Sequence, residues 1–459
     1  MNYNLLQVKY LYINYMNYDF NELIHTLNQY NININIDLEK VNGSNIFRNI
    51  NDCINNCRFI NVRKISNETL WKIHRNSEYP IMYLILKRLK ELGKLQQLFE
   101  FTGNMDNYDV FLLWYREHHH LIDINRLKVL IKSTNDEELL QYYEILYNPP
   151  KKRKFVHELL YNNPFVSIDV HQCYECSDII FEQYKGDNLT INLYRLTDDN
   201  ESYINRIVST ISIMRCFAEK YNGYNGNLTV TLFLSDIMKK INKNTDLVLC
   251  ADNINSGSCL PKHFINIWRK EELIKVLIHE LIHFHNFDFH RDSRDYDYLE
   301  SKINNKIVID GIDSCNESYT ESLAVFIYSC IMSTILKVPF ETVFNLEVKF
   351  LLYQVCKIIK YFNGTSLNDI FRITFVQNTS VRSYFIIKYL VLSNLNKFTK
   401  FIDDNGCVMS SKIRSYGDFI DNLLNTTNFL NTDNIFDNVD LNNNTFNTKT
   451  LRMSLYDFY

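Results

Sequence analysis

The sequence predicts an α+β fold in which a small mixed sheet is backed by helices. Residues 189–194 and 228–234 alternate β-branched and apolar residues in the manner of strands, and residues 264–268 form a third strand candidate. Residues 204–220 and 270–284 have the length and apolar content of helices. A sheet with helices packed against it follows from this order of elements.

Helical patterns dominate on both sides of this region. Before residue 150 the chain mixes apolar residues and charges at three- and four-residue spacing, which predicts a mainly helical N-terminal domain of unknown role, residues 1–150. Further helices at about 317–335, 341–361 and 383–395 predict a helical C-terminal subdomain.

The predicted domain boundary is the stretch 148–154, which joins two prolines to a basic run. We interpret it as a solvated linker, with a nuclear-localisation signal as the alternative. The second domain is then residues 155–425. The Asn-rich residues 426–459 form a tail that we expect to be loosely packed or irregular.

Composition narrows the class of protein. The 459 residues are 46% hydrophobic and 22% charged with a net charge of −4, values that disfavour disorder, a membrane protein and a basic nucleic-acid-binding surface. The N-terminus has no secretory pattern, and the longest uncharged stretch, 322–336, is shorter than the roughly 20 residues that span a bilayer. Eleven scattered cysteines predict reduced thiols, and hence a cytoplasmic protein. The Asn and Ile content suits an AT-rich genome, and for a virus or intracellular pathogen the compartment would be the host cytoplasm.

One motif carries chemistry. His279, Glu280 and His283 form an H-E-x-x-H sequence on the predicted helix 270–284. Positions i and i+4 share one helical face, so both imidazoles can bind one metal ion while Glu280 reaches the water bound to it. The alternative is that both histidines are hydrogen-bonded residues of the core.

A second acidic motif follows the histidines. Glu317 and Glu321 stand four residues apart on a segment that otherwise has the pattern of an apolar helix. Buried carboxylates require a cation, so these two are candidates for the metal site. A third histidine ligand in the longer H-E-x-x-H-x-x-G-x-x-H pattern is excluded, because Asn286 and Phe289 occupy the required positions.

With these two motifs, the sequence resembles the gluzincins, zinc peptidases with a glutamate ligand on a later helix. Asn316-Glu317 followed by Thr320-Glu321 resembles the ligand helix of thermolysin-like peptidases, and the H-E-x-x-H tetrad is similar to that of clostridial neurotoxin light chains. The resemblance covers roughly residues 190–335. It implies a zincin-like catalytic domain with Zn²⁺ on His279, His283 and Glu317, and with Glu321 orienting a histidine. In an alternative register Glu321 is the ligand.

The resemblance also implies a function. We expect a zinc-dependent peptidase, an endopeptidase in this interpretation, with Glu280 as general base and a protein or peptide as substrate. Residues 253–260 would pair with an extended substrate, an ordinary turn being the alternative, and Arg382 or Tyr384 could stabilise the oxyanion. The competing hypothesis is an inactive zincin scaffold that acts as a protein-binding or effector module.

Two weaker metal-binding signals are set aside. Cys173 and Cys176 have the spacing of a zinc knuckle but lack a second pair, and the run His118–His120 places its side chains in different directions around a helix. Nucleic acid is not expected as a partner, and the sequence leaves the oligomeric state open.

Overall fold

The computed structural model describes residues 27, 37–70, 78–99, 114–115, 118, 121–147, 160, 163, 165–175, 177, 179–196, 203–241, 247–289, 291–426, 436–437, 439, 441 and 450–456. The predicted linker 148–154 and most of the predicted tail lie outside these residues. The chain divides into two compact units. The larger comprises residues 1–66, 182–194 and 200–459, and the smaller comprises residues 67–181 and 195–199.

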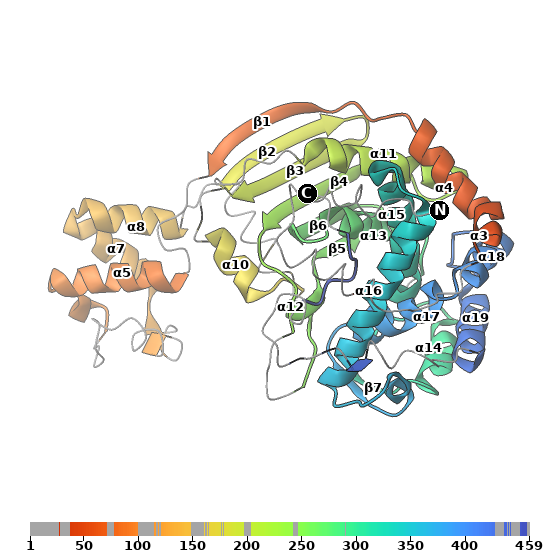
Figure 1. Cartoon of the computed structure of the whole chain (residues 1–459). Coiled ribbons are helices and arrows are strands. Elements are labelled where there is room, and N and C mark those ends of the chain that lie inside the picture. The colour runs from red at the N-terminus through yellow and green to blue at the C-terminus, as the bar shows by residue number, and fades with distance from the viewer. Residues whose placement is uncertain are drawn as a thin grey trace. The chain divides into compact units, whose positions relative to one another are not determined.

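The fold is α+β with a mixed six-stranded sheet, as the sequence predicted (Figure 1). The strand order is β1-β2-β3-β4-β6-β5, in which β4 and β6 are parallel and β5 and β6 antiparallel. The strands are β1 (Arg63–Leu70), β2 (Ile179–Gly186), β3 (Leu189–Leu196), β4 (Leu228–Ser235), β5 (Gly257–Leu260) and β6 (Phe264–Arg269). The three predicted strands are confirmed as β3, β4 and β6.

Helices pack in layers against this sheet in the larger unit. Helix α13 contacts β5 and β6, and it contacts α11 and α15 with other parts of its surface. The helices are α3 (Leu38–Gly43), α4 (Asn45–Asn56), α11 (Ile204–Lys220), α12 (Ala251–Ile254), α13 (Leu273–Phe284), α14 (Tyr296–Asn304), α15 (Asn316–Leu336), α16 (Phe340–Tyr361), η3 (Leu367–Phe371), the π-helix η4 (Arg382–Ile387), α17 (Lys388–Leu392), α18 (Leu395–Asn405) and α19 (Ile413–Thr426). A two-stranded parallel sheet joins β7 (Ile309–Gly311) to β8 (Phe375–Gln377).

The predicted helices in this unit are confirmed, with one difference. The predicted helix 383–395 is instead the π-helix η4 followed by α17, and a turn separates α17 from α18. A π-helix inserts an extra residue in one turn, and such insertions are frequent at functional sites.

The smaller unit is helical and has its own core. Its described helices are α5 (Glu78–Glu91), η1 (Leu95–Gln97), α7 (Ile124–Thr134), α8 (Glu137–Tyr147) and α10 (Ile168–Glu175). Apolar residues of α5, α7 and α8, such as Met82, Leu127 and Leu139, are fully buried against one another. The helical prediction for this part of the chain is therefore confirmed where residues are described.

The division into units differs from the predicted boundary at residue 150. Residues Leu38–Asn56 belong to the larger unit, because Ile46 and Ile50 on α4 are buried in its core. The carboxylate of Asp403 also accepts hydrogen bonds from the backbone N–H groups of Asn45 and Ile46, at 2.7 and 2.9 Å, and so caps the N-terminus of α4 from 357 residues away. Sequence patterns report local periodicity, and this docking depends on a distant residue.

For residues 450–456 the predicted irregular structure is confirmed, but the predicted loose packing is wrong. They form no helix or strand, yet Leu451, Met453, Leu455 and Tyr456 are buried in the core of the larger unit. Polar side chains of the surrounding helices hold their backbone.

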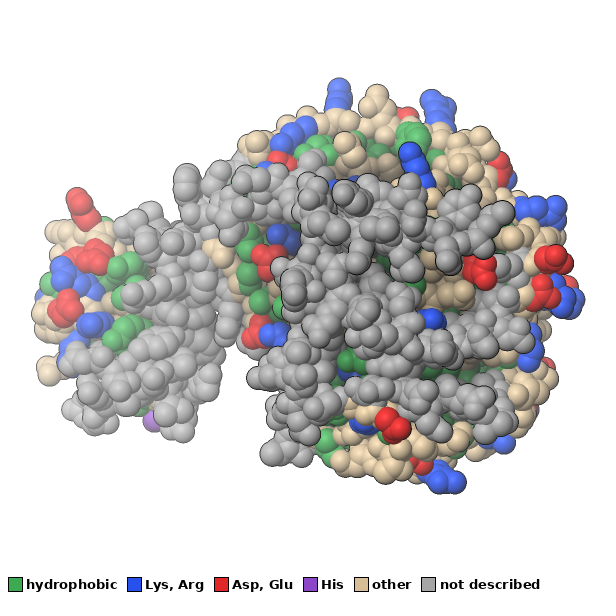
Figure 2. All heavy atoms as spheres, in the orientation of Figure 1, with side chains coloured by type: hydrophobic (Ala, Val, Ile, Leu, Met, Phe, Trp, Pro, Cys, Tyr) green, Lys and Arg blue, Asp and Glu red, His purple; other side chains and the backbone are tan. Residues whose placement is uncertain are grey.

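One described helix, α15, is long and apolar enough to cross a membrane by length and composition. In the structure 83% of its apolar window is buried, and it contacts α13 and α16 in the manner of a core helix. Figure 2 shows basic and acidic side chains interspersed among the described residues of the visible face. On that described surface the two signs of charge are mixed.

Candidate metal centre

The H-E-x-x-H residues lie on α13, which is buried on nearly every side. Leu277, Ile278, Leu281 and Ile282 are completely inaccessible to solvent, so hydrophobic burial fixes the helix against the sheet and α15. This packing holds the polar face of α13 in place.

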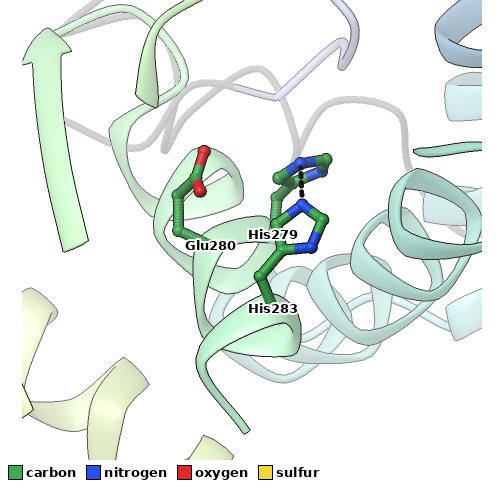
Figure 3. A group of neighbouring side chains, drawn as sticks. All are labelled: His279, Glu280 and His283. Atoms are coloured by element: carbon green, nitrogen blue, oxygen red, sulfur yellow. Dashed lines mark hydrogen bonds between the residues drawn. The ribbon is translucent and has the colours of Figure 1, made fainter. Parts of the chain in front are cut away.

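Figure 3 shows how the polar side chains of α13 are arranged. The rings of His279 and His283 meet in a T-shaped arrangement with their Nε2 atoms 3.1 Å apart, and Glu280 extends from a neighbouring side of the helix. One ligand atom from each of the three residues lies within 4.8 Å of the others. Among the described residues, no comparable group lies away from these side chains.

Glu317, in the first turn of α15, completes the convergence. Its Oε2 atom lies 3.2 Å from His279 Nε2 and 3.5 Å from His283 Nε2. This oxygen is buried, and among the described hydrogen-bonding groups it faces only the two imidazole nitrogens. The side chains of the two histidines and Glu317 are 8%, 13% and 14% exposed, so the site is enclosed but reachable from solvent.

Carboxylates behind the histidines indicate where their protons reside. His279 Nδ1 lies 2.9 Å from Glu321 Oε1, and His283 Nδ1 lies 2.7 Å from Asp288 Oδ2. A carboxylate favours N–H on the nitrogen that faces it, which leaves the Nε2 atoms of neutral rings as lone-pair donors. Both lone pairs then point toward each other and toward the unpaired oxygen of Glu317.

Three converging lone pairs repel one another unless a proton or a metal ion lies between them. A tetrahedral zinc ion with bonds of about 2.0–2.1 Å separates its ligand atoms by roughly 3.3 Å. The observed separations of 3.1, 3.2 and 3.5 Å match that spacing. The residues present could therefore hold a tetrahedral divalent ion, with three protein ligands as in catalytic zinc sites.

The electrostatics of the site also favour a cation. Burial disfavours protonation of both imidazoles, but Glu317 and Glu321 outweigh it and raise the pKa of His279. Asp288 and Glu317 likewise raise the pKa of His283 well above its usual value. Burial opposes ionisation of Glu317, yet the adjacent imidazoles lower the pKa of its carboxyl to about 2. The negative potential responsible for these shifts also attracts a metal ion.

Glu321 is placed differently from Glu317. Its Oε1 contacts His279 Nδ1 and Lys275 Nζ, and its Oε2 lies 3.1 Å from Lys388 Nζ. Both of its oxygens are thus occupied on the far side of the ring from the Nε2 atoms. Glu317 thus faces the Nε2 atoms of both histidines, whereas Glu321 faces Nδ1 of His279. Which of the two glutamates binds a metal stays a prediction.

Asp288 is a site residue that the sequence interpretation missed. It lies five residues after His283, in the turn beyond the end of α13, and it is buried. Asn316 Nδ2 connects it to the site, at 3.3 Å from Asp288 Oδ2 and 3.4 Å from Glu317 Oε1. Its sequence signal is an acidic residue shortly after the H-E-x-x-H helix. A histidine that binds a metal through one nitrogen needs a hydrogen-bond acceptor for the other.

Residues 253–260 form the last turn of α12 and the short strand β5. This strand is the last in the sheet order, pairs with β6 and contacts α13, so it is an edge strand and not an ordinary turn. Its pairing with a substrate stays a prediction. Gly257 packs directly on the H-E-x-x-H motif: a Cβ atom there would lie 2.5 Å from Glu280 Oε1. Only glycine permits this approach without movement of the carboxylate.

The two oxyanion candidates differ in availability. Arg382 is fully buried and its guanidinium donates to Asp313 Oδ2 at 2.8 Å, Asn304 Oδ1 at 2.6 Å and Ile307 O at 2.7 Å. These structural contacts occupy it away from the histidines. Tyr384, on the π-helix η4, has its ring centroid 6.3 Å from that of His279. Burial and the nearby carboxylates raise its pKa well above the usual value, so its hydroxyl remains a hydrogen-bond donor.

The other sequence signals lie away from this centre. Cys173 is half-buried on α10, whereas Cys176 and two of the three consecutive histidines, His119 and His120, lie outside the described residues. His118 stacks on Trp114 with ring centroids 5.2 Å apart. None of these described residues joins a metal-ligating group.

Comparison with known proteins finds no family model, curated protein or solved structure that matches this chain. The case for a function therefore depends on the geometry of His279, Glu280, His283 and Glu317.

Proposed function

We propose that this chain is a zinc-dependent peptidase, an endopeptidase with a zincin-like catalytic unit. The observation that carries the proposal is the convergence of His279 Nε2, His283 Nε2 and the unpaired Glu317 Oε2 within 3.5 Å of one another. A structural zinc site is usually closed by four protein ligands and has no use for an unligated acid beside it. Glu280 supplies such an acid, within 4.8 Å of the histidine ligands.

The chain's own residues supply the proton transfer. When bound, zinc would lower the pKa of a coordinated water toward about 7 and polarise the scissile carbonyl. Glu280 accepts the proton of the attacking water and delivers it to the leaving amine. Burial raises the pKa of this carboxyl, which makes it a stronger base than an exposed glutamate. The protonated hydroxyl of Tyr384 is the candidate donor to the oxyanion.

The edge strand provides a place for the substrate. An extended peptide can add to β5 through main-chain hydrogen bonds, and β5 lies against the helix that carries Glu280. Main-chain pairing binds a segment within a polypeptide as readily as its end, so it supports an endopeptidase. The substrate is then a protein or peptide, and the ten described cysteines, all free, suit a reducing cytoplasm.

The test joins metal analysis to cleavage of a mixed peptide library with and without a chelator. Wild type should carry about one zinc per chain and cleave only without chelator. Glu280→Gln should keep the zinc and lose 10²–10⁴-fold in rate, whereas Glu317→Gln should lose zinc. A wild type without zinc after metal-replete purification would refute the proposal. Zinc binding without any cleavage, with the biological effect intact in Glu280→Gln, would favour a protein-binding module instead.

A further inference from the structure

The segment 450–456 is held inside the larger unit by buried polar side chains. Gln354 Nε2 donates to Arg452 O at 2.8 Å, and Leu455 N donates to both oxygens of Glu347 at 3.1 and 3.0 Å. Lys357 Nζ donates to Thr450 O. These contacts come from α16 and bind the backbone of the segment, so they fix its position largely independently of its side chains.

Met453 is the residue of this segment that contacts both lysines beside Glu321. Its N–H donates to Glu272 Oε1 at 3.0 Å, and its carbonyl accepts from Lys388 Nζ at 2.9 Å. Its Sδ atom lies 3.5 Å from Lys275 Nζ. Polar groups on three sides therefore hold one methionine.

Lys275 and Lys388 both also contact Glu321. Lys275 Nζ contacts its Oε1, and Lys388 Nζ lies 3.1 Å from its Oε2. The two lysines come from α13 and α17, Glu321 comes from α15, and all three side chains are at most 2% exposed. Glu321 and Met453 are thus bridged twice by buried ammonium groups.

Such a cluster is poorly explained by stability alone. Removing two ammonium groups and a carboxylate from water costs several kcal/mol per ion, and apolar residues of similar volume are often at least as stable. The cluster does fix both oxygens of Glu321, the carboxylate 2.9 Å from His279 Nδ1. A fixed, ionised acceptor keeps the proton on Nδ1 and aims Nε2 at the metal position.

We propose that Lys275 and Lys388 are positioning residues for the metal centre, which fix Glu321 behind His279, and that the segment 450–456 holds both lysines through Met453. The inference rests on the proposed zinc site and adds to it a buried support built from four parts of the chain.

The test measures zinc affinity in the full-length chain by competition with a chelator, and the absorption spectrum of the Co²⁺ form. Lys388→Met should weaken zinc binding by up to about 10–100-fold and shift the Co²⁺ bands, because it releases the carboxylate that orients a proposed metal ligand. Glu321→Gln should do the same. Both substitutions act through the same contact between Glu321 and His279. The double variant should therefore bind zinc no more weakly than Glu321→Gln alone.

Lys357→Met is the matched control. Lys357 is also fully buried and contacts the same segment, but Glu321 takes its contacts from the other two lysines. We expect this variant to lose thermal stability while its zinc affinity is unchanged. Met453→Ala removes the sulfur and keeps the carbonyl, so it should weaken zinc binding less than Lys388→Met.

Several outcomes would overturn the inference. An unchanged zinc affinity in Lys388→Met would do so. An equal loss of zinc affinity in Lys357→Met would also do so, as would a double variant in which the losses of the two single variants multiply. If Lys388→Met does not fold, Lys275→Met carries the same expectation. Absence of zinc from wild type would instead refute the proposed function, whereas zinc-dependent cleavage combined with an unaffected Lys388→Met refutes this inference alone.

Discussion

Gly257→Ala tests whether the position of Glu280 matters for cleavage. The new Cβ would lie 2.5 Å from Glu280 Oε1 and 3.0 Å from Val276 Cγ1. The first distance falls 0.9 Å short of the 3.4 Å at which ordinary contact begins, so the carboxylate, as the freer group, has to move by about that much. A misplacement of about 1 Å can cost roughly 10²-fold in rate. We therefore expect the turnover number to fall by about that factor.

Zinc content separates this effect from loss of the metal, because Glu280 is not a proposed ligand. Gly257→Ala should keep one zinc per chain while cleavage of a library-derived peptide slows. Gly43→Ala is the matched control, since a Cβ at Gly43 meets no atom within 4 Å. An unchanged turnover number in Gly257→Ala would refute the claim that the position of Glu280 matters for cleavage. Loss of zinc from this variant would refute the claim that Glu280 acts separately from the metal ligands.

Two further predictions concern residues away from the reacting atoms. Asp288→Asn removes the carboxylate 2.7 Å from His283 Nδ1, so zinc affinity measured by chelator competition should fall about 10–100-fold; an unchanged affinity would contradict the orienting role. Burial raises the pKa of Glu271 to about 7 from 4.5, so the folded state binds more protons between those pH values and loses stability as pH rises through them. Glu271→Gln lacks this titration and should gain up to about 3 kcal/mol relative to wild type between pH 5 and 8, measured by urea unfolding; a constant difference across that range would contradict it.

The elements that sequence pattern could predict are those whose burial is locally periodic. Helix α11 spans Ile204–Lys220 as expected, and α15 and α16 begin and end within a residue or so of their predicted limits. The docking of α4 could not be predicted, because it depends on a carboxylate at Asp403 that no local pattern connects to it. Residues 450–456 alternate polar and apolar residues, yet both sets are buried, because side chains of distant residues hydrogen-bond their backbone. No local pattern identifies those partners.

The candidate site also has a part that local spacing predicts and a part that depends on contacts outside that spacing. The spacing of His279 and His283 on one helical face is a local property, and the structure places their rings as the motif predicted. Asp288 was missed because it acts from a turn, where no helical spacing relates it to the ring that it contacts. The sequence could not choose between Tyr384 and Arg382 as oxyanion donors. The residues that engage the Arg382 guanidinium lie about 70 to 80 positions earlier in the chain.

Glu317 and Glu321 were candidates for the metal site because buried carboxylates need a cation. In the structure the two glutamates have different partners. Glu321 has its cations within the chain, in Lys275 and Lys388. In sequence those lysines resemble ordinary surface residues, because their burial depends on a partner 46 or 67 positions away. Glu317 has no lysine or arginine within ion-pair distance among the described residues, and only the two imidazoles face it. The carboxylate that faces imidazoles instead of lysines is therefore the one that we propose as a metal ligand.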